Sequence, residues 1–76
     1  MECTAICPIN KKVDKYRIFL KSEKIIEVEK IKDLLQKMER KEIFQEDLTR
    51  VVSEKLGATV SIEGMHSGVF VRSTCP

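Results

Sequence analysis

The sequence has no long apolar run, and its N-terminus lacks the basic and then apolar layout of a signal peptide. We therefore expect a cytoplasmic protein with no membrane partner. Cysteine is scarce as well, and the spacing of Cys3, Cys7 and Cys75 matches neither a disulfide framework nor a zinc site. We expect no metal, and we interpret Cys3 and Cys75 as structural or free residues.

The chain also lacks a strong charge of either sign. Its 14 basic and 12 acidic residues give a net charge of +2, which is too small to indicate nucleic-acid binding by itself. The distribution is less even, because residues 11–24 contain six basic side chains (Lys11, Lys12, Lys15, Arg17, Lys21 and Lys24) and only two acidic ones. This segment is either a solvated strand face or a contact surface for RNA phosphates.

With 76 residues the chain suffices for one small domain, which we place at residues 1–76. A domain of this size buries only a limited core, and no metal or disulfide is predicted to reinforce it. Association of several copies would add stability, so we expect a homo-oligomer.

Alternating polar and apolar residues predict a strand over residues 14–21, with Tyr16, Ile18 and Leu20 on one side. A short turn at residues 22–23 and a second strand over residues 24–28 would complete a hairpin.

Two amphipathic helices follow in the predicted order. The first covers residues 29–40, where apolar residues at helical spacing form one stripe (Ile31, Leu34, Leu35 and Met38). The second covers residues 44–56, and Gly57 is placed to cap its C-terminus. Together these helices can cover one face of a sheet.

Strand character returns over residues 58–63 and 69–72, and a glycine-containing turn over residues 64–68 joins them. The predicted order is β-β-α-α-β-β, an α+β fold with a four-stranded antiparallel sheet and two helices on one face. Both edges of this sheet are expected to be exposed, and such edges invite pairing with another copy.

Cys7 is the first candidate for chemistry, and Asp14 follows it by seven residues. A thiol becomes nucleophilic where cations stabilise its thiolate, and Lys11, Lys12 and Lys15 are close in sequence. The alternative is that Cys7 is a small apolar residue that only fills space.

The segment Glu2-x-Thr4-x-x-Cys7-Pro8, followed by Asp14, resembles the signature that opens the catalytic region of the QueF family of tunnelling-fold enzymes. Those enzymes act on the nitrile of 7-cyano-7-deazaguanine. The resemblance implies that Cys7 adds to the nitrile carbon to give a thioimide, and that Asp14 moves protons. It also implies the β-β-α-α-β-β tunnelling fold, whose subunits join sheets edge to edge into rings with active sites between subunits.

Residues 44–47, Phe-Gln-Glu-Asp, resemble the Phe-His-Glu-Asp motif of the nitrile reductases in this family. The resemblance implies that Glu46 binds the guanine-like edge of the base, where two adjacent donors suit the two oxygens of a carboxylate. The alternative for Glu46 is a surface carboxylate that stabilises a helix N-terminus. Gln45 stands where the reductases have a histidine that donates a proton, and an amide cannot transfer protons near neutral pH.

Residues 27–34 align with the stretch Glu-Ser-Lys-Ser-Leu-Lys-Leu-Tyr, with which nitrile reductases hold their nicotinamide cofactor. Glu27 and Lys32 match, but Val28 replaces a serine and Glu29 replaces a lysine. A negative charge is unfavourable where a cofactor phosphate has to be held, so we expect no cofactor. His66, the only histidine, is either a solvated turn residue or part of the site.

Retention of Cys7, Asp14 and Glu46 without the cofactor-binding residues resembles the archaeal amidinotransferase branch of the family. That resemblance implies conversion of the nitrile of 7-cyano-7-deazaguanine, installed in tRNA, into the amidine of archaeosine with ammonia. Two alternatives are a nitrile reductase with an altered NADPH site and a tunnelling-fold subunit that only binds or assembles.

Overall fold

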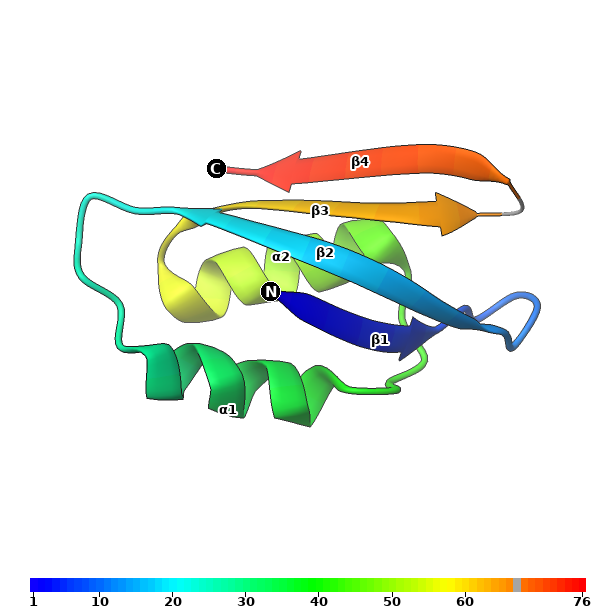
Figure 1. Ribbon diagram of the computed structural model, residues 1–76, viewed down its shortest axis with the longest axis horizontal. Coiled ribbons are helices and arrows are strands. Elements are labelled where there is room, and N and C mark those ends of the chain that lie inside the picture. Colours follow the sequence, from blue (N-terminus) through cyan, green and yellow to red (C-terminus); the bar gives the residue numbers. More distant parts are fainter. Residues whose placement is uncertain (67) are drawn as a thin grey trace.

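The computed structural model describes residues 1–66 and 68–76 and contains four strands and two helices. In chain order they are β1 (Glu2–Ile6), β2 (Val13–Lys21), α1 (Val28–Met38), α2 (Gln45–Leu56), β3 (Thr59–His66) and β4 (Val69–Cys75). The strands form one antiparallel sheet in the order β1-β2-β3-β4, and both helices cover the same face of it (Figure 1). The predicted α+β class and element order are confirmed.

The first hairpin differs from the prediction. It joins β1 to β2, whereas residues 24–27 lie outside the sheet and Val28 begins α1. The strand β1 takes the place beside β2 that the predicted strand would have had, since Arg17 pairs with Glu2 on β1 and with Glu63 on β3. Only the last residues of β2, from Phe19 to Lys21, pair with β3 alone, and residues 24–28 do not join them.

The core lies between the sheet and the two helices. Tyr16 and Ile18 point from β2 toward the helices and are buried, as the alternation predicts. The predicted stripe of α1 faces the same core, with Ile31, Leu35 and Met38 buried and Leu34 packed against them. Leu48 and Val52 of α2 and Val60 and Ile62 of β3 complete the core.

Both helices have clear ends. The helix α2 starts after Phe44 and stops at Gly57, whose φ of 62° lies in the left-handed region that glycine adopts without strain, so the predicted cap is confirmed. The helix α1 stops at Met38, before the predicted end at Arg40. Arg40 itself has a φ of 58°, which a continuing helix does not allow.

The linker between the helices, residues 40–43, runs along the outer edge of β1. The N–H of Arg40 donates to the carbonyl of Thr4 at 2.7 Å, and the N–H of Ile6 donates to the carbonyl of Lys41 at 2.8 Å. The N–H of Ile43 then donates to the carbonyl of Ile6 at 3.0 Å. The prediction of two exposed edges is therefore wrong at β1, whereas β4 has no further strand beside it in the described residues.

The second hairpin closes later than predicted. Gly64, Met65 and His66 belong to β3 and not to a turn, because they continue the pairing with Val71, Phe70 and Val69 of β4. Ser67, which the predicted turn also contains, lies outside the described residues.

The ring of Tyr16 packs against the backbone of Gly64, which has no side chain in its way. The two residues are directly opposite each other on β3 and β2. A Cβ atom at position 64 would lie only 2.5 Å from Cδ1 of Tyr16 and 2.6 Å from Cε1. The ring therefore lies across β3 at a position where any side chain would displace it.

We expect Gly64→Ala to lower the free energy of unfolding by about 1–3 kcal/mol, the usual cost of overpacking a filled site. Chemical denaturation followed by circular dichroism measures this. The matched control is the same substitution in a Tyr16→Leu background, where the ring atoms are gone and the cost should largely disappear. Equal costs in both backgrounds would show that the ring is not the obstacle.

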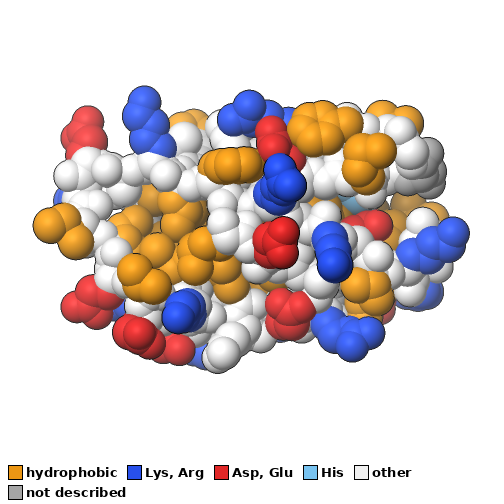
Figure 2. Space-filling view, in the orientation of Figure 1, with side chains coloured by type: hydrophobic (Ala, Val, Ile, Leu, Met, Phe, Trp, Pro, Cys, Tyr) orange, Lys and Arg blue, Asp and Glu red, His pale blue; other side chains and the backbone are white. Residues whose placement is uncertain are grey.

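Basic and acidic side chains are interspersed over the face shown in Figure 2. The basic residues of β2, Lys15, Arg17 and Lys21, are exposed and alternate with the buried residues, so they lie on the sheet face opposite the helices. Glu63 lies beside Arg17 in the ladder and 3.8 Å from Arg72. Three of the six basic residues of this stretch thus lie on one strand face, where Glu63 is an acidic neighbour. No helix among the described residues has both the length and the apolar character to span a bilayer.

Candidate active site

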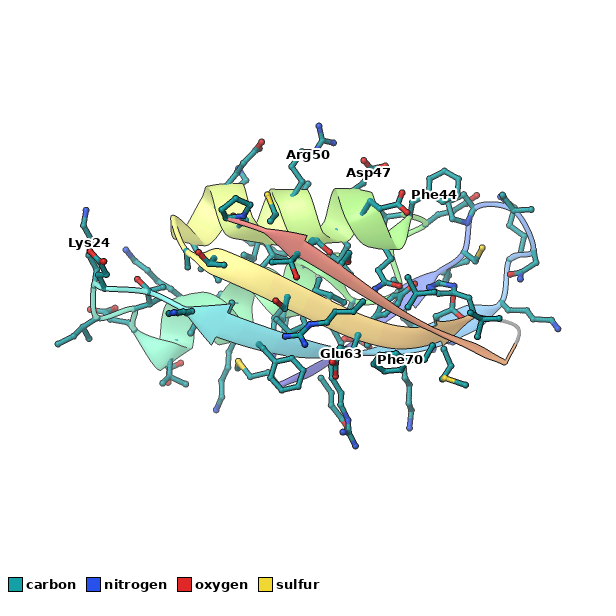
Figure 3. All side chains as sticks on the ribbon, turned by 90° about the horizontal axis from the view of Figure 1, so that it is seen from above. Lys24, Phe44, Asp47, Arg50, Glu63 and Phe70 are labelled. Carbon is teal, nitrogen blue, oxygen red and sulfur yellow. The ribbon has the colours of Figure 1, made fainter. Side chains whose placement is uncertain are left out.

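A cavity of about 290 Å³ lies where the loop after β1 meets the N-terminus of α2. Its lining includes Cys7, Tyr16, Phe44, Gln45, Glu46 and His66. These residues come from the loop, from β2, from the first turn of α2 and from the end of β3. Figure 3 shows Phe44 at the end of α2 where the helix begins. The structure thus brings together four of the five predicted site residues.

Cys7 is held by the backbone of a tight loop. Its N–H donates to the carbonyl of Lys12 and its carbonyl accepts from the N–H of Lys11, both at 2.9 Å. The Lys11 side chain forms an ion pair with Glu42, and Lys15 lies on the opposite face of the sheet. Two of the three lysines that are close in sequence are thus engaged or placed elsewhere, and the thiol is partly exposed in the cavity.

Asp14, the fifth predicted residue, lies behind the cavity wall. Its Oδ2 is 3.6 Å from Nδ1 of His66 and 3.5 Å from the hydroxyl of Tyr16. The side chain of Asp14 is 15% exposed and that of His66 is 32% exposed. Asp14 thus reaches the cavity through two side chains that line it.

Gln45 is buried and makes four polar contacts. Its Nε2 donates to the carbonyls of Ile62 at 2.8 Å and Val71 at 3.1 Å, and it lies 3.2 Å from the hydroxyl of Ser73. Its Oε1 lies 2.7 Å from Nε2 of His66. The amide therefore ties α2 to β3 and β4 at the floor of the cavity.

Two groups near the cavity have strongly raised pKa values. Burial first, and then the Asp14 carboxylate and Cys7, raise the pKa of the Tyr16 hydroxyl well above its usual range. Burial first, and then Glu39, raise the pKa of the Cys3 thiol to about 11. At neutral pH Tyr16 is consequently a neutral hydroxyl that can donate a hydrogen bond, and Cys3 remains a thiol of low nucleophilicity.

No protein-family model matches this sequence, and a search of curated proteins gives no match either. Among solved structures, the chain matches the crystal structure of the archaeosine synthase QueF-Like in the apo form. The TM-score is 0.84 at 21% sequence identity, and the match covers 99% of this chain and 85% of the other. The chain has the QueF-like fold. The predicted tunnelling fold is thereby confirmed.

In this QueF-like fold the helix linker couples the two halves of the cavity. Ile6, whose carbonyl accepts from Ile43, immediately precedes Cys7. Ile43 precedes Gln45 and Glu46 by two and three residues. A backbone hydrogen bond therefore sets the separation between the loop that carries the thiol and the helix turn that carries the carboxylate.

Tyr16 is the site residue that sequence reasoning missed. It was predicted only as a core residue of β2, yet its hydroxyl is 3.5 Å from Asp14 and 3.4 Å from Nε2 of His66. Its position two residues after Asp14 on the same strand face was the available signal. His66, for which two interpretations were open, lines the cavity at the end of β3 and is not a turn residue.

Proposed function

We propose that this protein is a tRNA-modifying amidinotransferase, which converts the nitrile of 7-cyano-7-deazaguanine in tRNA into the amidine of archaeosine with ammonia. The observation that carries the proposal is that Cys7 and Glu46 line one cavity about the size of a single base. The fold supports it, since the matching structure is that of an archaeosine synthase. A volume of about 290 Å³ is at the lower end for ligand pockets, as suits a base and not a larger ligand.

The proposed reaction starts with attack by the Cys7 thiolate. Its Sγ bonds to the nitrile carbon, one π bond of the nitrile breaks, and the nitrogen takes that electron pair and one proton to give a thioimide. Ammonia then adds to the same carbon, the carbon–sulfur bond breaks, and the thiol is released as the amidine forms. Nothing is oxidised or reduced, so the reaction needs no nicotinamide.

Glu46 is the group that we propose for recognition of the base. It lies in the first turn of α2 at the cavity, where a negative charge interacts favourably with the helix dipole. Its two oxygens can accept from the two adjacent donors of a deazaguanine edge. Ile43, Phe44 and Val71 add apolar walls for the flat face of the ring.

Intact mass spectrometry after incubation with 7-cyano-7-deazaguanine tests the proposal directly. We expect the protein to gain the mass of the base, and the modified tRNA to yield archaeosine when ammonia is supplied. Steady oxidation of NADPH in the presence of the free base would instead indicate a nitrile reductase. Absence of any adduct with either the free base or the tRNA would favour a subunit that only binds or assembles.

We expect Glu46→Gln to weaken binding of the base roughly ten- to a hundredfold. An amide places an N–H against one of the donors, and loss of a charge-assisted contact costs about 1.5–3 kcal/mol. Isothermal titration with the Cys7→Ala variant measures binding without reaction.

Asp47→Asn is the matched control for this prediction, because Asp47 also lies in the first turn of α2 but pairs with Arg50 at 3.2 Å. Figure 3 shows Asp47 and Arg50 on the side of α2 that faces away from the sheet. Equal affinities of the Glu46 and Asp47 variants would return Glu46 to a role in helix stability.

We also propose that several copies assemble to complete each site. Ile9 and Phe44 at the cavity are 79% and 44% exposed, and β4 leaves its outer edge open in the described residues. On the sheet face opposite the helices Phe70 is 59% exposed, and Figure 3 shows it beside Glu63. Apolar residues at these positions are costly in a lone small domain.

Multi-angle light scattering at micromolar concentration should therefore report a mass several times that of the 8.8 kDa chain. The measurement is repeated over a dilution series, where a ring joined through strand edges should keep a defined mass before it dissociates. A folded monomer at every concentration would contradict the shared site.

A further inference from the structure

The contacts of Gln45 fix the hydrogen-bonding state of His66. The carbonyls of Ile62 and Val71 only accept hydrogen bonds, so the amide nitrogen of Gln45 must face them, at 2.8 and 3.1 Å. The amide oxygen therefore faces Nε2 of His66 at 2.7 Å. Since an amide oxygen also only accepts, Nε2 of His66 has to carry a proton in both the neutral and the charged ring.

The other ring nitrogen of His66 faces a carboxylate. Nδ1 lies 3.6 Å from Oδ2 of Asp14, an ion-pair distance that a small closure converts into a hydrogen bond. Catalytic hydrogen bonds are often long before substrate binds. Because Nε2 donates its hydrogen bond to Gln45, one further proton can lie between Nδ1 and Oδ2. It is bound either to His66, beside an ionised Asp14, or to Asp14, beside a neutral His66.

We propose that Asp14 and His66 act as one proton-sharing pair, oriented by Gln45, and that this pair supplies the proton to the nitrile nitrogen. The inference rests on the proposed function and adds His66 as the acid and Gln45 as its positioning residue. It answers a chemical difficulty, because an ordinary carboxyl group is ionised at neutral pH and has no proton to give. An imidazole can hold one there.

The proton step balances within the described residues. As Sγ of Cys7 bonds to the nitrile carbon, the shared proton moves to the nitrogen, and the pair is left as a neutral His66 beside an ionised Asp14. The other titratable groups that share this cavity are Cys7, Tyr16 and Glu46. Tyr16 keeps its proton and can donate a hydrogen bond to Asp14.

Nitrogen-15 NMR of the protein without substrate tests the pair independently of any activity. His66 is the only histidine, so its two ring nitrogens give the only imidazole signals. We expect a proton on Nε2 throughout, and we expect Asp14→Asn to change the signal of Nδ1, which faces Asp14, while Nε2 keeps its proton. A neutral ring with its proton on Nδ1 would overturn the proposal without any variant.

Gln45→Leu removes the acceptor that holds the proton on Nε2 of His66, so both neutral tautomers of the ring should become populated. Ser53→Ala is the matched control, because Ser53 is a buried polar residue farther along α2 whose hydroxyl donates to the carbonyl of Ala58 at 2.7 Å. It should leave the His66 signals unchanged. If the Gln45→Leu variant does not fold, the tautomer of His66 in the parent protein still decides which ring nitrogen carries the proton. If the variant folds and the tautomer is unchanged, the proposed role of Gln45 is overturned.

The rate of adduct formation then tests the acid. His66→Gln should slow formation of the thioimide by about 100-fold or more, the usual contribution of a positioned acid, while the folded NMR spectrum is retained. A rate within threefold of the parent would overturn the role of His66. If the parent itself forms no adduct, the proposed function fails, and the NMR experiment still decides whether the pair exists.

Discussion

Replacing Cys7 with alanine is expected to abolish covalent capture of 7-cyano-7-deazaguanine and to leave the fold intact. Among the described residues that line the cavity, Cys7 alone carries a sulfur atom, and its side chain is partly exposed, so the substitution leaves the packed core unchanged. Neither remaining cysteine is placed to take over. Cys3 is buried with its pKa raised to about 11, so it stays protonated at neutral pH. Intact mass spectrometry should show no gain of mass in the variant at any pH from 6 to about 9.

Cys75→Ala is the matched control, because Cys75 lies at the far end of β4 and is absent from the cavity lining. It should gain the mass of the base at the rate of the parent. Alkylation with iodoacetamide at about pH 8 gives a second comparison, in which Cys7 should react and Cys3 should be protected. If Cys7→Ala still gains the mass of the base, another residue is the nucleophile and the mechanism fails.

Asp14→Asn is expected to slow adduct formation by roughly 100- to 10,000-fold, with binding of the base largely retained. The amide keeps the size of the side chain but can no longer share a proton with His66, 3.6 Å away. Stopped-flow or quenched mass measurements give the rate, and titration with the Cys7→Ala form of each protein gives the affinity. The loss should therefore appear in the rate and not in the dissociation constant.

Asp33→Asn provides the charge-matched comparison, since Asp33 is exposed on α1 and does not line the cavity. It should react as the parent does. A change of less than threefold for Asp14→Asn would remove Asp14 from the proton transfer, whatever the NMR of His66 shows.

The sequence was sufficient for features that repeat locally. Alternation along β2 identifies its buried side, including Tyr16 and Ile18, and helical spacing identifies the core stripe of α1. Gly57 marks the end of α2 because the C-terminal cap requires a left-handed backbone conformation, which glycine adopts readily. Each of these signals lies within one element, where side-chain periodicity reports directly on burial.

Features that depend on pairing between distant segments could not be predicted in the same way. Residues 24–28 have β-branched side chains, but whether they pair depends on β2, which pairs instead with β1 over residues 13–17 and with β3 over residues 16–21. The contact between Gln45 and His66 joins positions 21 residues apart, and no local pattern announces it. The resemblance of the motifs predicted that Cys7 and Glu46 belong to one site, and both line the cavity, but it did not predict that Tyr16 contacts Asp14 and His66.

The helix linker has a consequence for changes in chain length. Surface connections usually absorb insertions and deletions, and the exposed loop at residues 22–27 should do so. Residues 40–43 cannot absorb such changes, because they form backbone hydrogen bonds with Thr4 and Ile6 in a fixed register, as a strand does. One residue more or less would shift Glu46 against Cys7 by about one strand step of 3.3 Å, enough to take the base out of reach of the thiol. Working relatives or redesigned versions should therefore vary in length at residues 22–27 and keep a constant length between α1 and α2.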